Sequence, residues 1–424
     1  MRARITLVLA ASLGLAACQG DDLAPTGASP SNAAAAQEDL FTLVASPALN
    51  SEQRNLLATI RGRPSTSELN VARIAGAPAS LLQQGRAVRL ILAPGRQVVA
   101  IGDWTEQRAP NDLSWSGVIQ GEPGTVQLVL NSAGVTATVR TERSQYFIEP
   151  LVGGGLHAIS RIEQANLPPE HTADNPSGVA SFAGSPLGDS PFQPGAAYSA
   201  SLAAATTQTV LVVYTASAAS ASGNITGAIQ LAVDETNRSY SNSAVNITSS
   251  KVHVAQVTYN EANRSFSQHV SALRSTTDGI MDNVHTLRNT YAADLVVLVV
   301  NDSEACGMAA AIKATASYAF AAAHYTCITG YYSFGHEIGH LQGARHDRYV
   351  DSSTSPYPYG HGYIPASKSW RTIMAYGNNC NNCTRIQYWS NPNVTYGGVA
   401  MGTTTYENNA RVLNETASTV AAFR

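Results

Sequence analysis

The sequence predicts a mixed α/β (α+β) unit at residues 208–424, built on a twisted mixed sheet and preceded by a β-rich unit at residues 39–167. Short apolar runs alternate with polar residues in the first unit, whereas buried strands alternate with helical patterns in the second. Between them, residues 168–207 are rich in Pro, Gly, Ser and Ala, which is typical of a linker. A chain of 424 residues is also too long for one ordinary domain.

The composition is that of a folded protein and argues against some partners. It is 44% hydrophobic and 13% charged, with a net charge of −3. Because no long basic run is present, we expect neither nucleic acid nor an anionic membrane surface to be bound by charge.

Residues 1–17 predict a targeting segment. Arg2 and Arg4 precede an apolar stretch at residues 5–17 that is too short to span a membrane stably. The sequence therefore predicts export.

The end of this segment, Leu-Ala-Ala before Cys18, resembles the bacterial lipoprotein signal, in which the Cys after the cleavage site is lipidated. Since Gln19 and not Asp follows, the resemblance implies the outer membrane or the cell surface. An ordinary signal peptide with a chance Cys is the alternative. Residues 18–38 are expected to be a flexible tether.

In residues 39–167 the alternating runs predict antiparallel strands. These runs are residues 88–92, 97–101, 125–130 and 135–139. His157, the only histidine of this unit, is expected to be a surface or core residue, and nothing here predicts catalysis.

In residues 208–424 the patterns predict strands and helices in alternation. The strands are expected at residues 209–215, 251–258 and 293–300, and the helices at 224–240, 266–291 with a break near 278–279, and 406–423. A short edge segment is expected between residues 306 and 327.

Residues 336–347 carry the strongest chemical signal, HEIGHLQGARHD. His336 and His340 are four residues apart, so a helix places them on one face, where both can bind one Zn²⁺. Gly343 is expected to end the helix, because Gly enters the left-handed region at little cost. The returning chain then brings His346 as a third ligand. Three protein ligands and one free position are typical of a catalytic zinc site.

Glu337 lies beside the first histidine and is expected to act as general base on a water without being a ligand. The alternative, that these are surface histidines on a polar helix, leaves Gly343 and His346 unexplained. One catalytic Zn²⁺ is expected; a structural Ca²⁺ is possible but not indicated.

The complete motif resembles the zinc signature of metzincin peptidases, which place a Met in a turn under the histidines. Met374, in the sequence TIMAY, fits that turn. Asp347 resembles the adamalysin (reprolysin) branch and is expected to orient the ligand loop or the Met-turn. Tyr376 resembles the Tyr that follows the Met in astacins and serralysins. It is either a donor to the oxyanion or a packed turn residue.

This mixed pattern is most similar to the bacterial reprolysin-like group that includes the peptidyl-Asp metalloendopeptidases. That resemblance implies a zinc endopeptidase that acts on proteins or peptides, with a preference for Asp on the carboxyl side of the cut. Substrate is expected to lie along residues 307–309 as an added strand. Four basic residues are candidates for a pocket, or are solvated: Arg345, Arg348, Lys368 and Arg371.

Four cysteines remain besides Cys18, and an even number in an exported protein predicts two disulfides. The simplest pairing joins Cys306 to Cys327 and Cys380 to Cys383. Two other pairings remain open, as does a zinc or redox site at residues 380–383.

The resemblance implies that residues 39–167 are a pro-domain that inhibits the enzyme intramolecularly. No Cys occurs between residues 19 and 305, so a cysteine cap on zinc is excluded. A carboxylate cap from Asp189 or Glu170, or steric blocking, is expected instead. Cleavage within residues 168–207 would activate the enzyme and release it from the lipid anchor.

Two other functions remain open at this stage. One is a surface-anchored binding protein with a non-catalytic metzincin unit. The other is a zinc hydrolase of narrow specificity that acts on cell-wall or glycoprotein substrates.

Overall fold

A computed structural model describes residues 38–153, 155–172, 178–180 and 205–424, which belong to one compact unit spanning residues 37–424. Cys18, the targeting segment and Asp189 lie outside the described residues. Among the residues that the structure describes, no helix is long and apolar enough to cross a membrane.

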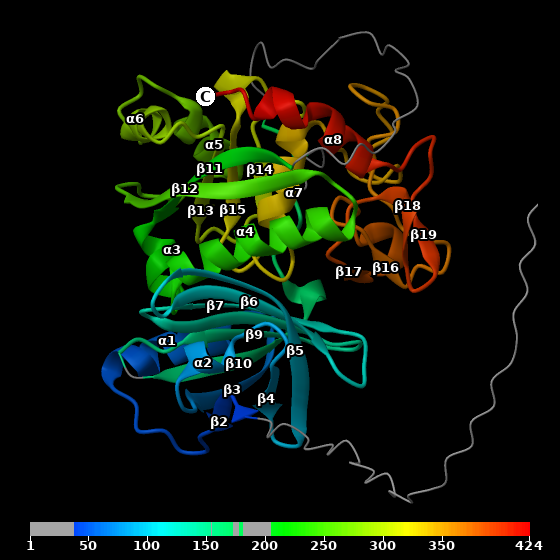
Figure 1. The fold of residues 1–424 in the computed structure, drawn as a ribbon. Coiled ribbons are helices and arrows are strands. Elements are labelled where there is room, and N and C mark those ends of the chain that lie inside the picture. The colour runs from blue at the N-terminus through cyan, green and yellow to red at the C-terminus, as the bar shows by residue number, and fades with distance from the viewer. Residues whose placement is uncertain (1–37, 154, 173–177, 181–204) are drawn as a thin grey trace, which may run out of the picture. The chain divides into compact units, whose positions relative to one another are not determined.

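The N-terminal region is rich in sheet, and all but one of its strand pairs are antiparallel (Figure 1). Ten strands form one sheet in the order β1-β4-β5-β6-β7-β8-β9-β10-β3-β2. They are β1 (Glu38–Asp39), β2 (Phe41–Leu43), β3 (Thr66–Ile74), β4 (Ala87–Ala93), β5 (Arg96–Ala109), β6 (Asp112–Ile119), β7 (Thr125–Asn131), β8 (Gly134–Arg140), β9 (Gln145–Pro150) and β10 (Leu156–Ile162). β1 pairs with β4 and β2 pairs with β3, so consecutive strands lie at the two edges of the sheet. Two helices accompany the sheet, α1 (Ser51–Gly62) and α2 (Pro78–Leu81).

The second sheet has five strands in the order β12-β11-β13-β15-β14. Its strands are β11 (Thr206–Thr215), β12 (Ile247–Val257), β13 (Leu295–Val300), β14 (Gly307–Ala309) and β15 (Phe320–His324). The pairs are parallel except that of β14 with β15, so the sheet is mixed, as predicted.

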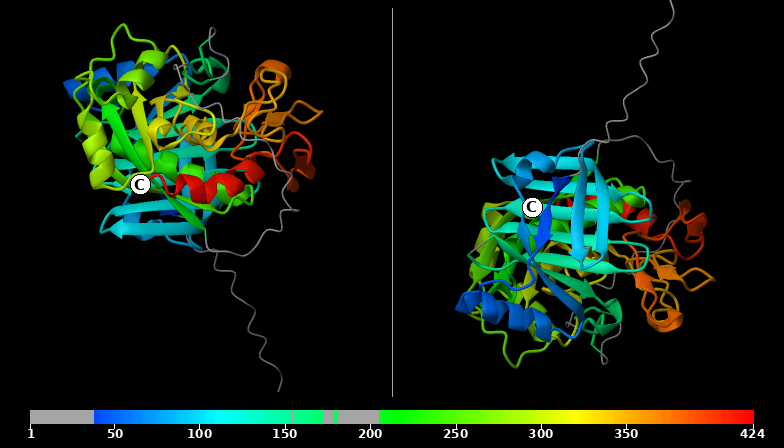
Figure 2. Two further views of the ribbon diagram at one scale, coloured as in Figure 1. Left: turned by 90° about the horizontal axis from the view of Figure 1, so that it is seen from above. Right: turned by 90° about the horizontal axis from the view of Figure 1, so that it is seen from below.

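Helices cover both faces of this sheet. Successive side chains of a strand point to opposite sides, so alternate residues of one strand pack against different helices. Leu295, Val297 and Val299 pack with residues of α3 (Ala216–Ala221), α4 (Ile225–Asn242) and α7 (Ser333–Gln342). The alternate residues of β13 pack with α5 (Phe266–Arg274) and α6 (Asn283–Thr290). The last helix, α8 (Asn409–Val420), packs against α7 (Figure 2).

Most predicted elements of this unit are present. The helix expected at residues 266–291 is divided into α5 and α6, with Gly279 at a φ of +76° between them, near the expected break. The edge-segment prediction was incomplete, because residues 320–324 form β15, a strand between β13 and β14. Its sequence FAAAH hides it, since Ala has little preference for strands.

The sheet-rich region contacts residues 205–424 through α4, which packs on β7 and β8. Thr138 Oγ1 donates a 2.6 Å hydrogen bond to Glu235 on α4, and Ser114 bonds Asp234. From the other side, the Arg63 guanidinium donates to the carbonyl of Ala221 at 2.8 Å.

Candidate metal centre

Helix α7 carries the first part of the site. His336, Glu337 and His340 lie in its buried turns, and the helix ends at Gly343, whose φ is +111°. Gly339 faces Trp389, where an added Cβ would lie 2.6 Å from the indole ring. The helix is thus buried on all sides and packed closely against Trp389, which holds the two histidines in place.

The structure brings His336, His340 and His346 together, as the motif predicts, and adds a fourth imidazole. The Nε2 atom of His346 lies 3.1 Å from that of His336 and 2.9 Å from that of His340. His171, from the segment expected to be a linker, places its Nε2 3.0 Å from His346 Nε2 and 3.2 Å from His336 Nε2. All four side chains are buried.

The outer nitrogens of three of these rings face carbonyl oxygens. Nδ1 lies 2.9 Å from Ile373 O in His336, 2.9 Å from Ala344 O in His340, and 2.7 Å from Gly307 O in His171. A carbonyl only accepts, so Nδ1 carries the proton and the converging Nε2 atoms present lone pairs.

Burial keeps the rings neutral, lowering the pKa of His340 to about 3 and that of His171 to about 4. The Nε2 atoms of His171 and His336 both present lone pairs, so they cannot hydrogen-bond each other across 3.2 Å, whereas a cation between them satisfies both. The residues therefore fit a metal ion that imidazole nitrogen binds, such as Zn²⁺.

Glu337 is buried at 1% exposure beside this cluster. Its Oε2 has no hydrogen-bond partner among the described residues, and burial raises its pKa well above the usual value. An added Cβ on Gly307 of β14 would lie 2.3 Å from Glu337 Oε1. The glycine thus lets the carboxyl group lie against the edge strand, where its free oxygen is available to a reacting water.

The residues expected to support the site lie around it. Asp347 Oδ2 accepts a 2.8 Å hydrogen bond from the backbone N–H of Tyr376. Met374 is buried with Trp389 in one apolar cluster. The Tyr376 ring centre is 4.3 Å from that of His346, and burial raises the pKa of its phenol well above 10. Asp347 thus joins the ligand loop to the turn after Met374.

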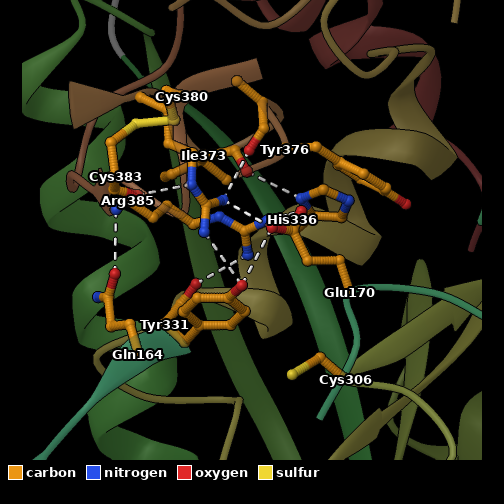
Figure 3. A network of polar contacts seen from close by, with 12 residues as sticks. Gln164, Glu170, Cys306, Tyr331, His336, Ile373, Tyr376, Cys380, Cys383 and Arg385 are labelled. Atoms are coloured by element: carbon orange, nitrogen blue, oxygen red, sulfur yellow. Dashed lines mark hydrogen bonds and ion pairs between the residues drawn. A yellow bond between two sulfur atoms is a disulfide. The ribbon is translucent and has the colours of Figure 1, made fainter. Parts of the chain in front are cut away.

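Next to the imidazoles lies a cluster of two guanidinium groups and a carboxylate (Figure 3). Glu170 forms ion pairs with Arg371, at 2.7 Å, and with Arg385. Tyr331 donates a 3.0 Å hydrogen bond to Glu170, and its ring lies under Arg385, 4.2 Å from the guanidinium carbon. The prediction that the carboxylate of Glu170 caps the metal site was wrong. Glu170 is paired with the two arginines, and its neighbour His171 faces the other histidines.

Of the four basic candidates, the structure places one in this cluster. Arg345 is paired with Asp351, Arg348 lies over the Tyr406 ring, and Lys368 bonds Asn379. Only Arg371 of the four reaches Glu170.

Sequence reasoning missed Arg385 and His171. Arg385 is brought in by β17 (Thr384–Arg385), which pairs with β16 (Trp370–Arg371) so that Arg371 and Arg385 are in register. No local pattern marks either residue, since their partners are far away in the chain. His157, by contrast, is a core residue that accepts a hydrogen bond from Val135 N.

Part of the segment at 168–180 runs along the edge of the second sheet. Ala180 N donates to Ala309 O at 2.9 Å, and Ala309 N donates to Gly178 O at 3.0 Å. Cys306 N also donates to Pro169 O. The chain itself therefore occupies the edge at residues 307–309 where substrate was expected.

Both disulfides are present in the simplest pairing. Cys306 is bonded to Cys327, and Cys380 to Cys383. The second disulfide spans the turn just before β17, the strand that carries Arg385. Because both cysteines are bonded, the zinc alternative at residues 380–383 was wrong, whereas the redox alternative stays a prediction.

The fold and the histidine cluster define a metal-dependent peptidase, and comparisons with known proteins agree. Residues 204–390 match the family described as Metallo-peptidase family M12. A peptidyl-Asp metalloendopeptidase of Xanthomonas campestris pv. campestris is 39% identical, and the match covers 99% of this chain and 98% of the relative.

Two further relatives of the same name come from Stenotrophomonas maltophilia. That of strain K279a is 38% identical over 90% of this chain and 92% of its own, and that of strain R551-3 is 42% identical over 75% of each. The chain belongs to metallopeptidase family M12 and is a metalloendopeptidase.

Among solved structures, one titled "Structure of a chaperone-substrate complex" aligns with a TM-score of 0.42 and 21% identity. It covers 52% of this chain and 35% of that chain, a likeness too low to carry an argument.

Proposed function

We propose that this chain is an exported zinc endopeptidase made as a zymogen, with a preference for Asp on the carboxyl side of the cleaved bond. The observation that carries the proposal is the convergence of three Nε2 atoms, from His336, His340 and His346, beside the buried carboxyl of Glu337.

The chemistry assigned to each group follows from this geometry. His336, His340 and His346 would hold Zn²⁺, which when bound polarises a carbonyl and lowers the pKa of water. Glu337 takes a proton from the attacking water and returns it to the amine that leaves as the C–N bond breaks. Tyr376, kept protonated by burial, is a donor for the developing oxyanion.

The preference for Asp has two supports. The three relatives are named peptidyl-Asp metalloendopeptidases and match across most of this chain. The site also contains two buried arginines, Arg371 and Arg385, whose charge suits an acidic residue.

Latency has its support in the segment at 168–180. Residues 178–180 lie along β14 and His171 lies at the histidine cluster, so a substrate cannot add a strand there while they remain. Residues 39–167 would then be the pro-domain that holds the segment in place, and a cut between residues 181 and 204 would begin its release.

Export rests on the sequence alone. The signal segment and Cys18 support a lipoprotein of the outer membrane or cell surface, whose catalytic part is released when the chain is cut.

The test is hydrolysis of a denatured protein by the full chain after limited proteolysis between residues 168 and 207. We expect cleavage that a zinc chelator abolishes, with the products mapped by mass spectrometry. Glu337→Gln should lower kcat by about 10²–10⁴-fold, because it removes the general base, and should leave zinc content unchanged, because Glu337 is not a ligand. Absence of any cleavage by the nicked wild type would contradict the peptidase proposal and favour a binding role.

A further inference from the structure

Arg371 and Arg385 form a buried pair of like charges. They are register partners on two parallel strands, so their side chains project on the same side. They are 2% and 1% exposed. Two guanidinium groups this close repel each other, and burying them is costly unless carboxylate oxygens compensate.

Within the described residues, both ion pairs of these arginines are made with one carboxylate, that of Glu170. Their other hydrogen bonds go to neutral oxygens, including Ala375 O and Cys383 O. Two positive charges therefore share one negative charge. This pocket is built to hold a carboxylate, and if Glu170 leaves it loses the one carboxylate among the described residues that forms ion pairs with both arginines.

Glu170 belongs to the segment that activation would displace, and its neighbour His171 lies at the histidine cluster. Consecutive residues are 3.8 Å apart along a chain, so a peptide lying across the cluster has a side chain next to the arginines. An acidic side chain there regains the ion pairs that Glu170 made.

We propose that Arg371, Arg385 and the Tyr331 hydroxyl form the pocket that selects an acidic substrate residue beside the cleaved bond, and that Glu170 is the internal occupant of this pocket in the intact chain. The proposal rests on the proposed peptidase function and assigns its specificity to named residues. An amide in place of the carboxylate leaves both guanidinium groups without a counter-charge, so we expect Asn to be rejected by about 10²-fold or more.

The test compares matched peptides that differ only in Asp, Glu, Asn or Ala at one position, using the nicked full chain. We expect the ratio of kcat/KM for Asp over Asn to be about 10² or more in the wild type. Arg385→Gln and Arg371→Gln should lower this ratio toward one, whereas Arg385→Lys, which keeps the charge, should retain part of it.

Two basic residues that lie outside the pocket serve as controls. Arg348→Gln and Lys368→Gln remove a positive charge outside the pocket and should keep the wild-type ratio. Melting curves identify any variant that is not folded, in which case the wild-type ratio decides the outcome.

A wild-type ratio near one, or a ratio unchanged in both folded arginine variants, would overturn the pocket and leave the peptidase intact. Failure of the wild type to cleave any peptide would overturn the proposed function and the pocket with it.

A second inference rests on the imidazole cluster alone. With its Nδ1 proton directed to Gly307 O, His171 presents an unprotonated Nε2 within 3.2 Å of the corresponding atoms of His336 and His346. The ring of His171 is arranged like those of His336 and His340, whose Nδ1 atoms also face carbonyl oxygens. We infer that His171 is the fourth protein ligand of the metal in the intact chain, where it takes the position that catalysis needs.

The test is made on the full chain, loaded with Zn²⁺ and not nicked. X-ray absorption at the zinc edge should count four imidazole ligands in the wild type and three with one oxygen in His171→Ala. A chelator should remove zinc at least about tenfold faster from His171→Ala, because a ligand is lost.

Glu170→Gln is the matched control, since it loosens the same segment without removing an imidazole. It should keep four imidazole ligands. Equal ligand counts and equal rates of zinc loss in the wild type and His171→Ala would overturn the inference.

Discussion

Glu337 and Gly307 are packed so closely that no methyl group fits between them. The glycine lies on the edge strand β14, and Glu337 is only 1% exposed. The position of the Glu337 carboxyl group therefore depends on the absence of a side chain on a different element.

We predict that Gly307→Ala lowers kcat/KM of the nicked chain by about 10²-fold, because a Cβ 2.3 Å from Glu337 Oε1 displaces the base by about an ångström. Peptide hydrolysis measures this. Gly62→Ala, where the added Cβ meets no atom within 4 Å, should leave the rate unchanged. A wild-type rate in Gly307→Ala would mean that the carboxyl group need not lie here.

At the scale of elements, the end of α7 determines where the third histidine lies. Gly343 turns the chain with a φ of +111°, and the backbone N–H of Ala344 donates to Gly339 O at 2.9 Å. The helix places two imidazoles by its own periodicity, whereas this turn returns the chain to deliver His346.

We predict that Gly343→Ala costs about 1–2 kcal/mol of folding free energy and speeds the loss of zinc to a chelator. The φ is unfavourable for Ala, and the added Cβ would lie 3.0 Å from the Tyr357 ring, so the turn and His346 shift. Melting temperature and chelator kinetics measure the two effects. Gly397→Ala shares the strain of a positive φ in open space, and should lower stability without changing zinc loss. If both variants lose zinc equally, the turn does not control the site.

At the scale of the whole molecule, two acidic side chains of α4 are buried against the sheet-rich region. Glu235 bonds Thr138 and Gly330 N, and burial raises its pKa to about 7. Burial also raises the pKa of Asp234 to about 6. At a pH between the ordinary carboxyl pKa and these raised values, both groups are therefore protonated in the folded state and ionised in the unfolded state.

The raised pKa values of Glu235 and Asp234 make their contribution to folding stability more favourable at low pH than at high pH. Below about pH 4 both states are protonated, and the packed state keeps its full stability. As pH rises toward about 7, the unfolded state loses its protons first. The contribution of the two groups to folding stability then falls, by about 1.4 kcal/mol per unit of pKa difference.

We predict that the melting temperature of Glu235→Gln, relative to that of the wild type, increases between pH 4.5 and pH 7.5. An amide cannot ionise, so the contribution of Glu235 is removed. Thermal unfolding across this pH range measures it, with the exposed Glu142→Gln as control. A difference in melting temperature between Glu235→Gln and the wild type that stays constant with pH would show that the burial of this carboxyl group does not contribute to the pH dependence.

Many structural features of this protein are determined by residues close together in the chain and could be predicted from the sequence. His336 and His340 are one helical turn apart, and Gly343 is suited to the turn that follows, so their convergence needs no distant partner. The same holds for β13, whose run of apolar residues predicts a buried strand, and for the pairing of Cys380 with its neighbour Cys383.

Only the tertiary structure decided which distant residues join the site. His171 meets His336 across 165 residues, and Glu170 meets Arg385 across 215, so no spacing or period marks either pair. β15 was also hidden, because an Ala-rich segment becomes a strand only when neighbours on both sides bond to it. The chain alone therefore determined the three histidines that one helix and one turn bring together, and long-range packing determined what covers this cluster and which charges lie beside it. The physical reason is that local periodicity places residues a few positions apart, whereas distant ones meet only when the sheets assemble.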